Sequence, residues 1–304
     1  MSKILLIDVD SKIPNLALMK ISAYHKSIGD TVGFDVGDPD KVYISCIFTK
    51  NRHKVEGLAM LYPNVEIDIG GSGYDLDKRL DPAIERMTPD YDLYPNCGSY
   101  LGFTTRGCVR SCYFCIVRKK EGFFKHWYNS VDEALDNITG GDFSRFDRIS
   151  FLDNNILADK EWFITLCERL SHHKIKVDFN QGLDIRLLDD NCARALRKLK
   201  PISSWKFAFD DTGYKDYVER GIRILNEAGI RVRHDVMFYV YVHNDGQFED
   251  ALSRCRFLKD HGATPYVMLN QETEHTRRMK ELKRWCRPWI FWKIDLNEYT
   301  RCKV

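Results

Sequence analysis

Three cysteines on one short segment are the residues of this chain best suited to metal chemistry. They are Cys108, Cys112 and Cys115, spaced C-x3-C-x2-C in a stretch that begins Thr-Thr-Arg-Gly. Because cysteine thiolates ligate iron–sulfur clusters, three thiolates on one loop can hold three irons of a four-iron cluster. No fourth cysteine follows at ligand spacing. One iron of such a cluster would therefore stay open for a small molecule.

Two other interpretations of these cysteines are open. A structural zinc site needs a fourth ligand, usually in two C-x2-C or H-x3-H pairs, and the nearest downstream histidine, His126, has poor spacing. Free cysteines are also often buried, but Arg106, Gly107 and Arg110 in the same stretch argue against a core segment. The cluster is therefore the favoured interpretation.

The cysteine spacing, with Phe114 directly before the third cysteine, resembles the loop of the radical S-adenosylmethionine (radical SAM) superfamily. The resemblance implies that the open iron binds the amino and carboxylate groups of S-adenosylmethionine (SAM). It implies that reduction by the [4Fe-4S] cluster cleaves SAM to a 5′-deoxyadenosyl radical, which abstracts hydrogen from a substrate. It also implies that Phe114 belongs to the cofactor site, and that a flavodoxin or ferredoxin supplies electrons. The substrate and any catalytic residue stay unidentified.

Length and composition limit the classes of protein. The 304 residues are enough for one large or two smaller domains, and 44% of them are hydrophobic, which allows a substantial core. A formal net charge of only +2 does not by itself indicate nucleic acid or membrane as a partner. No apolar run approaches the length of a membrane span. Ten cysteines behind a start without a secretory signal predict a cytoplasmic location.

Apolar runs and helix-like periodicity predict an α/β protein with two domains. Residues 1–87 contain strand-like runs at 3–9, 41–48 and 64–70 with helical stretches between them, which predicts a small doubly wound, Rossmann-like domain. A linker follows at 88–98, where prolines and aspartates disfavour regular structure. Residues 288–304 are predicted to be a carboxyl-terminal extension that packs on the second domain.

Residues 99–287 repeat a strand–helix unit six times. The predicted strands are 100–106, 148–154, 176–183, 205–211, 232–242 and 265–271, each followed by a helical pattern. Six units are too few for the usual eight-stranded barrel. The pattern therefore predicts a partial (β/α)6 TIM-type barrel, which is the core fold that the radical SAM resemblance implies. The cysteine loop directly follows the first of these strands.

Polar residues at the ends of the later strands are predicted to lie at the same mouth as the cysteines, because parallel α/β folds gather their sites there. For the cofactor site these are Asp153, Asn154, Gln181, Asp184, Arg186 and Asp210. The resemblance implies that Asp153 or Asn154 contacts the SAM amino group. Arg186 is the candidate for the SAM carboxylate, because arginine can pair with a carboxylate bidentately, and Asp210 is a candidate for the ribose hydroxyls. The alternatives are a helix cap, a local Asp–Arg pair and a simple turn.

Other segments suggest substrate-side or partner-binding roles. Asn270 and Gln271 are substrate-side candidates, while Met237, Tyr239 and Tyr241 share one strand face that either lines the pocket or packs under helices; packing is favoured. Residues 118–128 interleave cations and aromatics, a pattern that single-stranded nucleic acid binding uses. Nucleic acid is therefore one candidate partner, with a solvated loop as the alternative.

The first domain resembles the cobalamin-binding domain that precedes the barrel in many radical SAM proteins. Residues 5–33 and the turn 69–74 carry this resemblance, but 8–12 lack the histidine of an Asp-x-His-x-x-Gly site. The first domain could bind cobalamin, or it could be a vestigial domain used for packing, and both interpretations are open. A cobalamin-dependent methyltransferase or cyclase and a tRNA methylthiotransferase-like enzyme are therefore alternative functions. A non-catalytic, zinc-stabilised binding module is the alternative of another class.

Overall fold

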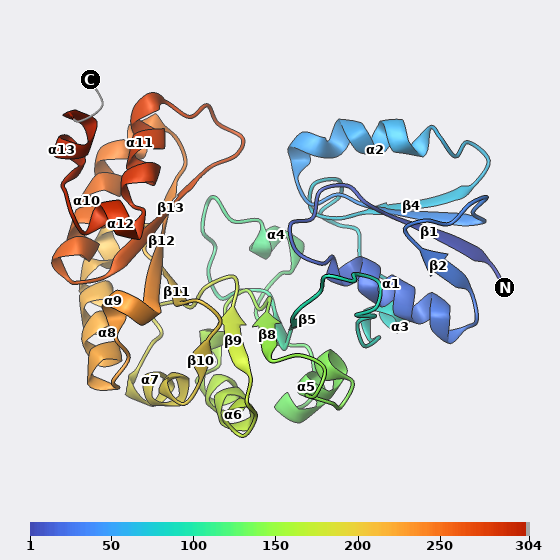
Figure 1. Cartoon of the computed structure of the whole chain (residues 1–304), viewed down its shortest axis with the longest axis horizontal. Coiled ribbons are helices and arrows are strands. Elements are labelled where there is room, and N and C mark those ends of the chain that lie inside the picture. Colours follow the sequence, from blue (N-terminus) through green and yellow to red (C-terminus); the bar gives the residue numbers. More distant parts are fainter. Residues whose placement is uncertain (302–304) are drawn as a thin grey trace. The chain divides into compact units, whose positions relative to one another are not determined.

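The computed structural model describes residues 1–301, and these form two compact units (Figure 1). Unit 1 comprises Met1–Thr104, Ile116–Gly122 and His126–Asp147. Unit 2 comprises Thr105–Cys115, Phe123–Lys125 and the chain from Arg148 onward. The cysteine loop, defined here as residues 107–115, therefore lies wholly in unit 2. The domain limits at 87, 98 and 287 stay a prediction.

Unit 1 is built on a parallel sheet in the order β2-β1-β3-β4. Its elements are β1 (Lys3–Asp8), α1 (Leu16–Ser27), β2 (Thr31–Gly33), β3 (Lys41–Ser45), α2 (Arg52–Ala59) and β4 (Glu66–Gly70). The two helices cover opposite faces of the sheet (Figure 1). Val55 of α2 packs on Leu5 and Ile44, whereas His25 of α1 reaches the Tyr43 hydroxyl at 3.2 Å. The predicted parallel α/β character of this region is confirmed.

The rest of unit 1 is mostly irregular chain with short elements. These are α3 (Pro82–Glu85), β5 (Tyr100–Gly102), α4 (Val117–Lys120) and α5 (Val131–Thr139). The strand predicted at 100–106 is wrong as one element, because it divides into β5 and β6 (Thr105–Arg106). The backbone N–H of Thr105 donates to the Asp153 carboxylate at 2.6 Å, so a side chain takes the place of a strand partner there.

Unit 2 contains two groups of parallel strands. The strands are β8 (Arg148–Phe151), β9 (Lys176–Phe179), β10 (Lys200–Pro201), β11 (Trp205–Ala208), β12 (Val236–Val242) and β13 (Thr264–Leu269). Strand β9 pairs with β8 and β10, and β12 pairs with β11 and β13. A parallel bridge between Leu183 and Phe207 joins the two groups. These strands agree with the predicted α/β class, and their closure into a partial (β/α)6 barrel stays a prediction.

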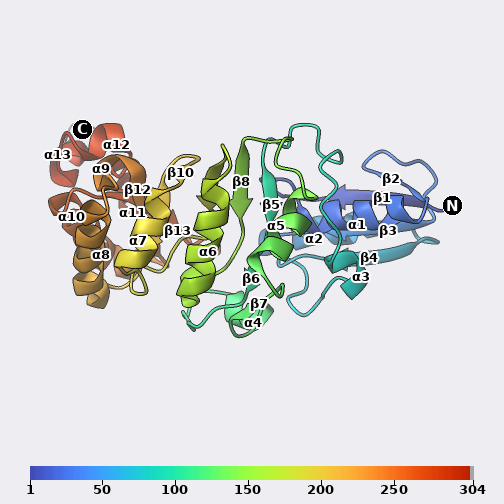
Figure 2. The ribbon, with the colours of Figure 1, turned by 90° about the horizontal axis from the view of Figure 1, so that it is seen from below.

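Helices connect these strands, and several begin at a polar cap. They are α6 (Lys160–Ser171), α7 (Asp190–Arg197), α8 (Lys215–Glu227), α9 (Val232–Asp235), α10 (Phe248–Asp260) and α11 (Arg277–Trp285). Asp159 accepts from the N–H of Trp162, and Asp189 from that of Cys192, which satisfies free donors at these helix starts. Helices α6, α7 and α8 follow one another along one side of the strands (Figure 2).

The fifth predicted strand, 232–242, begins too early. Its first four residues form the helical turn α9, and the strand β12 starts only at Val236. The physical reason is local. Arg231 binds both carboxylate oxygens of Asp235 at 3.0 Å, an i,i+4 pair that favours a helical turn. The sequence prediction extended the strand back to Val232 because it did not consider the pairing of Arg231 with Asp235.

The two faces of β12 and β13 differ in chemistry. Val236, Phe238 and Val240 are buried on the face that α10 covers. Tyr239 and Tyr241 point to the other face, where their register partners are Tyr266 and Met268. Tyr266 is 47% exposed and Met268 is 41% exposed. The favoured packing of Met237, Tyr239 and Tyr241 under helices is therefore wrong, since these side chains alternate with the buried set.

The carboxyl-terminal segment folds onto α10 and α11 as two short helices, α12 (Pro288–Phe291) and α13 (Leu296–Arg301). The Trp285 indole donates to the Ile294 carbonyl at 3.0 Å, and Arg256 pairs with Asp295 at 3.0 Å. Residues 302–304 of the predicted extension lie outside the described residues. Within residues 1–301, no helix is long and apolar enough to cross a bilayer.

Helix α8 approaches the chain after β9 so closely that its contact requires glycine. A Cβ atom at Gly221 would lie 2.3 Å from Cδ1 of Ile185, whose side chain is fully buried. We expect Gly221→Ala to lower the free energy of unfolding by about 1–3 kcal/mol through overpacking. Gly57→Ala is the control, because nothing lies within 4 Å of that position in α2. Urea denaturation compares the two, and an unchanged midpoint for Gly221→Ala contradicts the close approach.

Candidate functional site

The cysteine loop leaves β6 through Gly107, whose φ of 75° is one that glycine adopts readily. Cys108 and Cys112 are half-buried, and Cys115 is exposed. The N–H of Cys115 donates to the Cys112 carbonyl at 3.0 Å, so the last two cysteines flank a tight turn. The loop therefore presents three thiols on a short, curved segment at the end of a strand.

The end of β8 holds the start of this loop. Asp153 Oδ1 accepts from both the N–H and the hydroxyl of Thr105 at 2.6 Å. Asn154 Oδ1 accepts from the N–H of Gly107 at 3.0 Å. Asp153 and Asn154 were predicted at a strand end near the cysteines. They do lie beside the cysteine loop, where they position its backbone. Their predicted contact with the SAM amino group stays a prediction.

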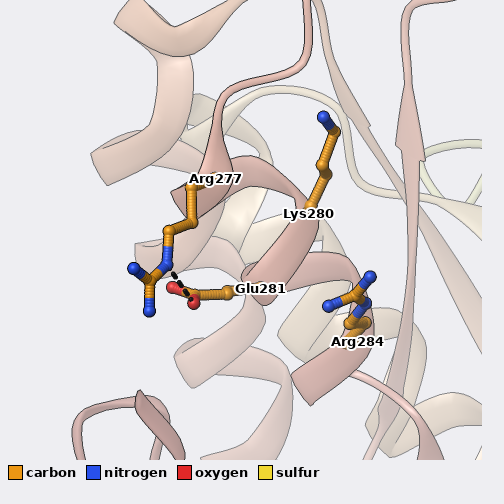
Figure 3. A pocket seen from close by; sticks show the side chains of 4 residues that line it. All are labelled: Arg277, Lys280, Glu281 and Arg284. Carbon is orange, nitrogen blue, oxygen red and sulfur yellow. Dashed lines mark hydrogen bonds and ion pairs between the residues drawn. The ribbon is translucent and has the colours of Figure 1, made fainter. Parts of the chain in front are cut away.

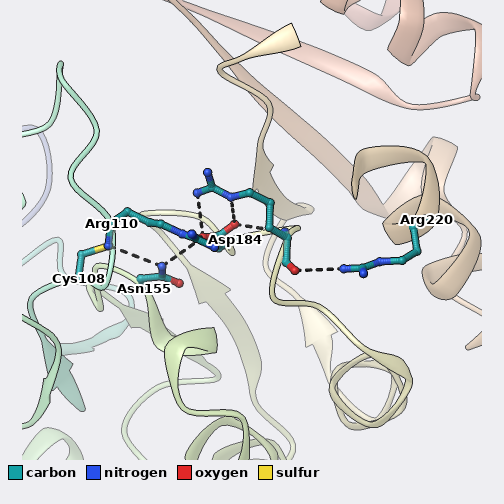
Figure 4. A network of polar contacts seen from close by, with 6 residues as sticks. Cys108, Arg110, Asn155, Asp184 and Arg220 are labelled. Carbon is teal, nitrogen blue, oxygen red and sulfur yellow. Dashed lines mark hydrogen bonds and ion pairs between the residues drawn. The ribbon is translucent and has the colours of Figure 1, made fainter. Parts of the chain in front are cut away.

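A buried carboxylate, that of Asp184, connects the loop to the segment that follows β9 (Figure 4). Arg186 donates to both of its oxygens, from Nε at 2.7 Å and from Nη2 at 2.9 Å. Arg110 of the cysteine loop donates from Nε at 3.1 Å, and Asn155 donates from Nδ2 at 3.4 Å. One carboxylate therefore binds three side chains from three separate segments.

The charges in this network explain the pKa shift of Asp184. Burial alone raises the pKa of this carboxyl group, but the hydrogen bonds and charges of Arg186 and Arg110 outweigh burial and lower it. Arg186 also lies over the Tyr214 ring, 4.3 Å from its centroid, and its side chain is only 15% exposed. The Asp184–Arg186 pair is thus a buried pair rather than a solvated one. The predicted role of Arg186 with a carboxylate ligand stays a prediction.

Asn155 is the residue of this network that is left with an unused group. Its Nδ2 lies 3.5 Å from Cys108 Sγ and faces the Asp184 carboxylate, and both of these neighbours are acceptors. This fixes the orientation of the amide. Its Oδ1 is buried and has no hydrogen-bond partner among the described residues. A buried acceptor without a donor is costly, so a ligand donor at this point would remove a real penalty.

The other side of the loop is held by an aromatic contact. Phe114 stacks on Tyr241 with ring centroids 4.3 Å apart and planes 23° from parallel. The N–H of Tyr241 donates to Asp210 at 2.9 Å. Buried Arg254 donates to the carbonyls of Phe209 and Tyr241 at 2.7 and 3.1 Å. Burial raises the pKa of Asp210, although the Tyr241 N–H and Arg254 act against that rise.

Sequence reasoning missed a second polar group at the end of β12. His243 Nδ1 lies 3.1 Å from Asn270 Nδ2 and 3.3 Å from the Tyr241 hydroxyl. Gln247 accepts from the N–H of His243 at 2.9 Å and donates to the Tyr113 hydroxyl at 2.8 Å. The signal was available, because His243 directly follows a strand, and Asp210 lies just after another. Asn270 was predicted and does belong to this group.

Not every predicted residue is brought together. Gln181 is exposed, and no hydrogen bond of its side chain is found in the described chain. Arg110 and Asn155 take part in the network but were not predicted, since their partners lie far away in the sequence. The structure thus adds Arg110, Asn155 and His243 to the predicted set.

The thiols carry mixed electrostatic influences. Burial raises the pKa of Cys112, neighbouring Cys115 raises it further, and Arg186 lowers it. Cys108 Sγ accepts from the N–H of Arg110 at 3.3 Å in addition to the Asn155 amide. Among residues 1–301, no three His, Cys, Asp or Glu side chains converge as the ligands of one metal ion do.

Comparison with known proteins gives similarity in fold. The chain is similar to the solved structure of the radical S-adenosylmethionine methyltransferase TsrM from Kitasatospora setae, which has cobalamin and a [4Fe-4S] cluster bound. The TM-score is 0.63 and the identity 11%, over 88% of this chain and 72% of TsrM. No family model and no curated protein matches the sequence. At this identity the similarity shows a shared fold, and the radical SAM class stays a prediction.

Removal of the Asp184 charge tests the network. We expect Asp184→Asn to lower the free energy of unfolding by about 3–5 kcal/mol, because two arginines lose a buried partner. Asp235→Asn is the matched control: the Arg231–Asp235 pair is also bidentate but its arginine is 72% exposed, so its loss is expected to cost far less. Urea denaturation at pH 7 measures both, and equal losses contradict a special role for Asp184.

The same variant has a predictable pH dependence. Because the folded-state pKa of Asp184 is lowered, its stabilisation is present above the ordinary carboxyl pKa of about 4 and is lost as the pH falls through the lowered value. The stability difference between wild type and Asp184→Asn is therefore expected to shrink below about pH 4. A difference that grows towards acid would show that the charge of Asp184 is not what stabilises the network.

Proposed function

We propose that this chain is a radical SAM enzyme whose loop cysteines Cys108, Cys112 and Cys115 hold a [4Fe-4S] cluster. When bound, the cluster supplies the electron that cleaves SAM to a 5′-deoxyadenosyl radical, and this radical abstracts hydrogen from the substrate. A flavodoxin or ferredoxin would reduce the cluster. The oxygen sensitivity of such a cluster favours a reducing compartment, which agrees with a cytoplasmic location.

One observation carries this proposal beyond the cysteine spacing. The buried Oδ1 of Asn155 lacks a donor, and the Nδ2 of the same amide lies 3.5 Å from Cys108 Sγ. A ligand ammonium group next to the cysteines would satisfy that oxygen, and SAM carries one. The fold similarity to TsrM supports the same class.

Different residues of the chain would bind different parts of SAM. Asp153 and Asn154 would keep the loop backbone in place, and Asn155 would accept from the SAM amino group. The guanidinium nitrogen of Arg186 that does not bind Asp184 would donate to the SAM carboxylate. Phe114, held by Tyr241, and Asp210 would border the nucleoside. Gln181 and His243 would then face the substrate side of the site.

We propose no cobalamin site in unit 1, because the glycine turn that carries this resemblance contacts other loops of the same unit. A Cβ at Gly71 would lie 2.2 Å from the Cys46 carbonyl, and one at Gly73 would lie 2.5 Å from Phe48, so the glycine turn lies directly on the backbone after β3. Asp10 accepts from the N–H groups of Ile47 and Phe48 at 2.7 and 3.0 Å. The loops at this sheet edge thus bind one another, and we propose no step that uses a corrinoid.

The methylthiotransferase-like and zinc-module alternatives are less well supported. Cys46 and Cys97 are the only cysteines before the loop, whereas the first alternative implies a second cluster on three amino-terminal cysteines. A zinc module offers no role for the unpaired oxygen of Asn155. The substrate of the proposed reaction stays open.

Anaerobic reconstitution tests the cluster. We expect about four irons and four sulfides per chain, and release of 5′-deoxyadenosine from SAM after reduction with dithionite. Cys112→Ala is expected to lose the cluster and the cleavage together, because a ligand thiolate is missing. Cys97→Ala is the matched control, since Cys97 is half-buried in unit 1, outside the cysteine loop. One bound zinc and no cleavage would refute the proposal.

Binding of SAM tests the role given to Asn155. Asn155→Ala is expected to weaken SAM binding to the reconstituted protein roughly tenfold, because one buried hydrogen bond is lost. Iron content is expected to stay near that of wild type. Asn191→Ala, at an exposed position in α7, is the control. Equilibrium dialysis gives the affinities. An unchanged affinity in Asn155→Ala would contradict the proposed hydrogen bond between Asn155 and the SAM amino group.

A further inference from the structure

Helix α11 and the turn after it carry an unusual concentration of positive charge. Residues 276–289 contain six cations, Arg277, Arg278, Lys280, Lys283, Arg284 and Arg287, and a single acid, Glu281. Their formal charge is +5, whereas the whole chain has a net charge of only +2. The other residues together therefore sum to −3. The positive charge of this protein is thus local and does not reflect a generally basic surface.

The cations stand on the solvent side of the helix. Met279, Leu282 and Trp285 are fully buried and hold α11 in unit 2. Arg277, Lys280 and Arg284 line an open hollow on the outer side, together with Glu281 (Figure 3). Residues three or four apart on a helix lie about 5–6 Å from each other. These side chains therefore form a line rather than a scattered group.

Only part of this charge is neutralised by acids. Arg277 pairs with Glu281 at 2.9 Å, and Arg278 pairs with Asp245 at 2.5 Å. In the part of the chain described by the structure, Lys280, Lys283, Arg284 and Arg287 have no acidic partner. The helix dipole accounts for cations in the last turn, such as Lys283 and Arg284. It gives no reason for Lys280 in the middle of the helix or for Arg287 beyond its end.

An exposed aromatic side chain adjoins the line of cations. Trp289 is 63% exposed, and the Arg287 guanidinium lies 5.7 Å from its ring centroid. Cations that track a phosphate backbone, with an aromatic ring on which a base can stack, are the combination that binds single strands. An acidic protein partner would be expected to need more apolar area than one tryptophan.

We propose that Lys280, Arg284 and Arg287 bind successive phosphates of a single-stranded nucleic acid and that Trp289 stacks on one of its bases. The start of α11 is tied to the loop after β12, because Thr276 and Arg278 both bind Asp245 at 2.6 and 2.5 Å. Asp245 follows His243 by two residues. The surface therefore begins at the end of the strand that carries His243, and it does not depend on the proposed cluster.

The test uses the full chain and a fluorescein-labelled single-stranded RNA of about twenty nucleotides, with fluorescence anisotropy between 50 and 200 mM KCl. Three to four phosphate contacts predict that wild-type affinity falls roughly 20- to 50-fold over this range. The variant Lys280→Gln/Arg284→Gln/Arg287→Gln is expected to bind at least tenfold more weakly at 50 mM, with a salt slope smaller by about two. Lys174→Gln/Arg194→Gln/Lys200→Gln makes the same charge change at exposed cations elsewhere. Equal losses in both variants would overturn the assignment to α11.

Trp289→Ala separates nucleic acid from other polyanions. It is expected to weaken RNA binding at least about fivefold without a change in the salt slope, because stacking involves bases rather than phosphates. Poly-glutamate of similar charge is expected to compete poorly and to be insensitive to this substitution. If poly-glutamate competes as well as RNA, or if Trp289→Ala has no effect on RNA, the partner is not a nucleic acid. Neither result depends on iron content or SAM cleavage.

Discussion

A buried carboxylate cannot remain charged without partners, and this requirement at Asp184 organises the candidate site. Its negative charge needs donors, and the chain provides them from the cysteine loop, from the end of β8 and from the segment after β9. Each donor brings its own segment to the same place. The position of Arg110, and with it the first half of the cysteine loop, follows from the electrostatics of one side chain.

The second half of the loop depends on a different kind of contact. The ring of Phe114 rests on Tyr241, and the backbone of Tyr241 is fixed from two directions. Asp210 accepts from its N–H, while Arg254 donates to its carbonyl. Because Arg254 is itself fully buried, the strand end cannot shift without exposing unsatisfied groups. A charged network on one side and an aromatic stack on the other therefore hold the three thiols.

The sequence predicted the kinds of element and the places where polar residues gather, because both follow from local patterns. The cysteine spacing, the alternation of strands with helices, and Asp153, Asp184 and Asp210 at strand ends needed no tertiary information. Which side chains pair with one another did require tertiary information. Nothing local reveals that Asp184 takes Arg110 as a partner, that the Asn155 amide keeps an unpaired oxygen, or that Asp153 binds the N–H of Thr105 where β6 begins. Such choices depend on which segments meet in space. The helical turn at residues 232–235 likewise depends on one side-chain pair, Arg231 with Asp235.

The distance along the chain between the partners of the loop has a consequence for biogenesis. Gln247 binds Tyr113 across 134 residues of sequence. At a synthesis rate of about 5–20 residues per second, roughly 7 to 27 seconds pass between the two. During that time the cysteines have left the ribosome but the strand that supports Phe114 does not yet exist. The loop therefore gains the full set of contacts that holds its second half only after synthesis has passed Gln247.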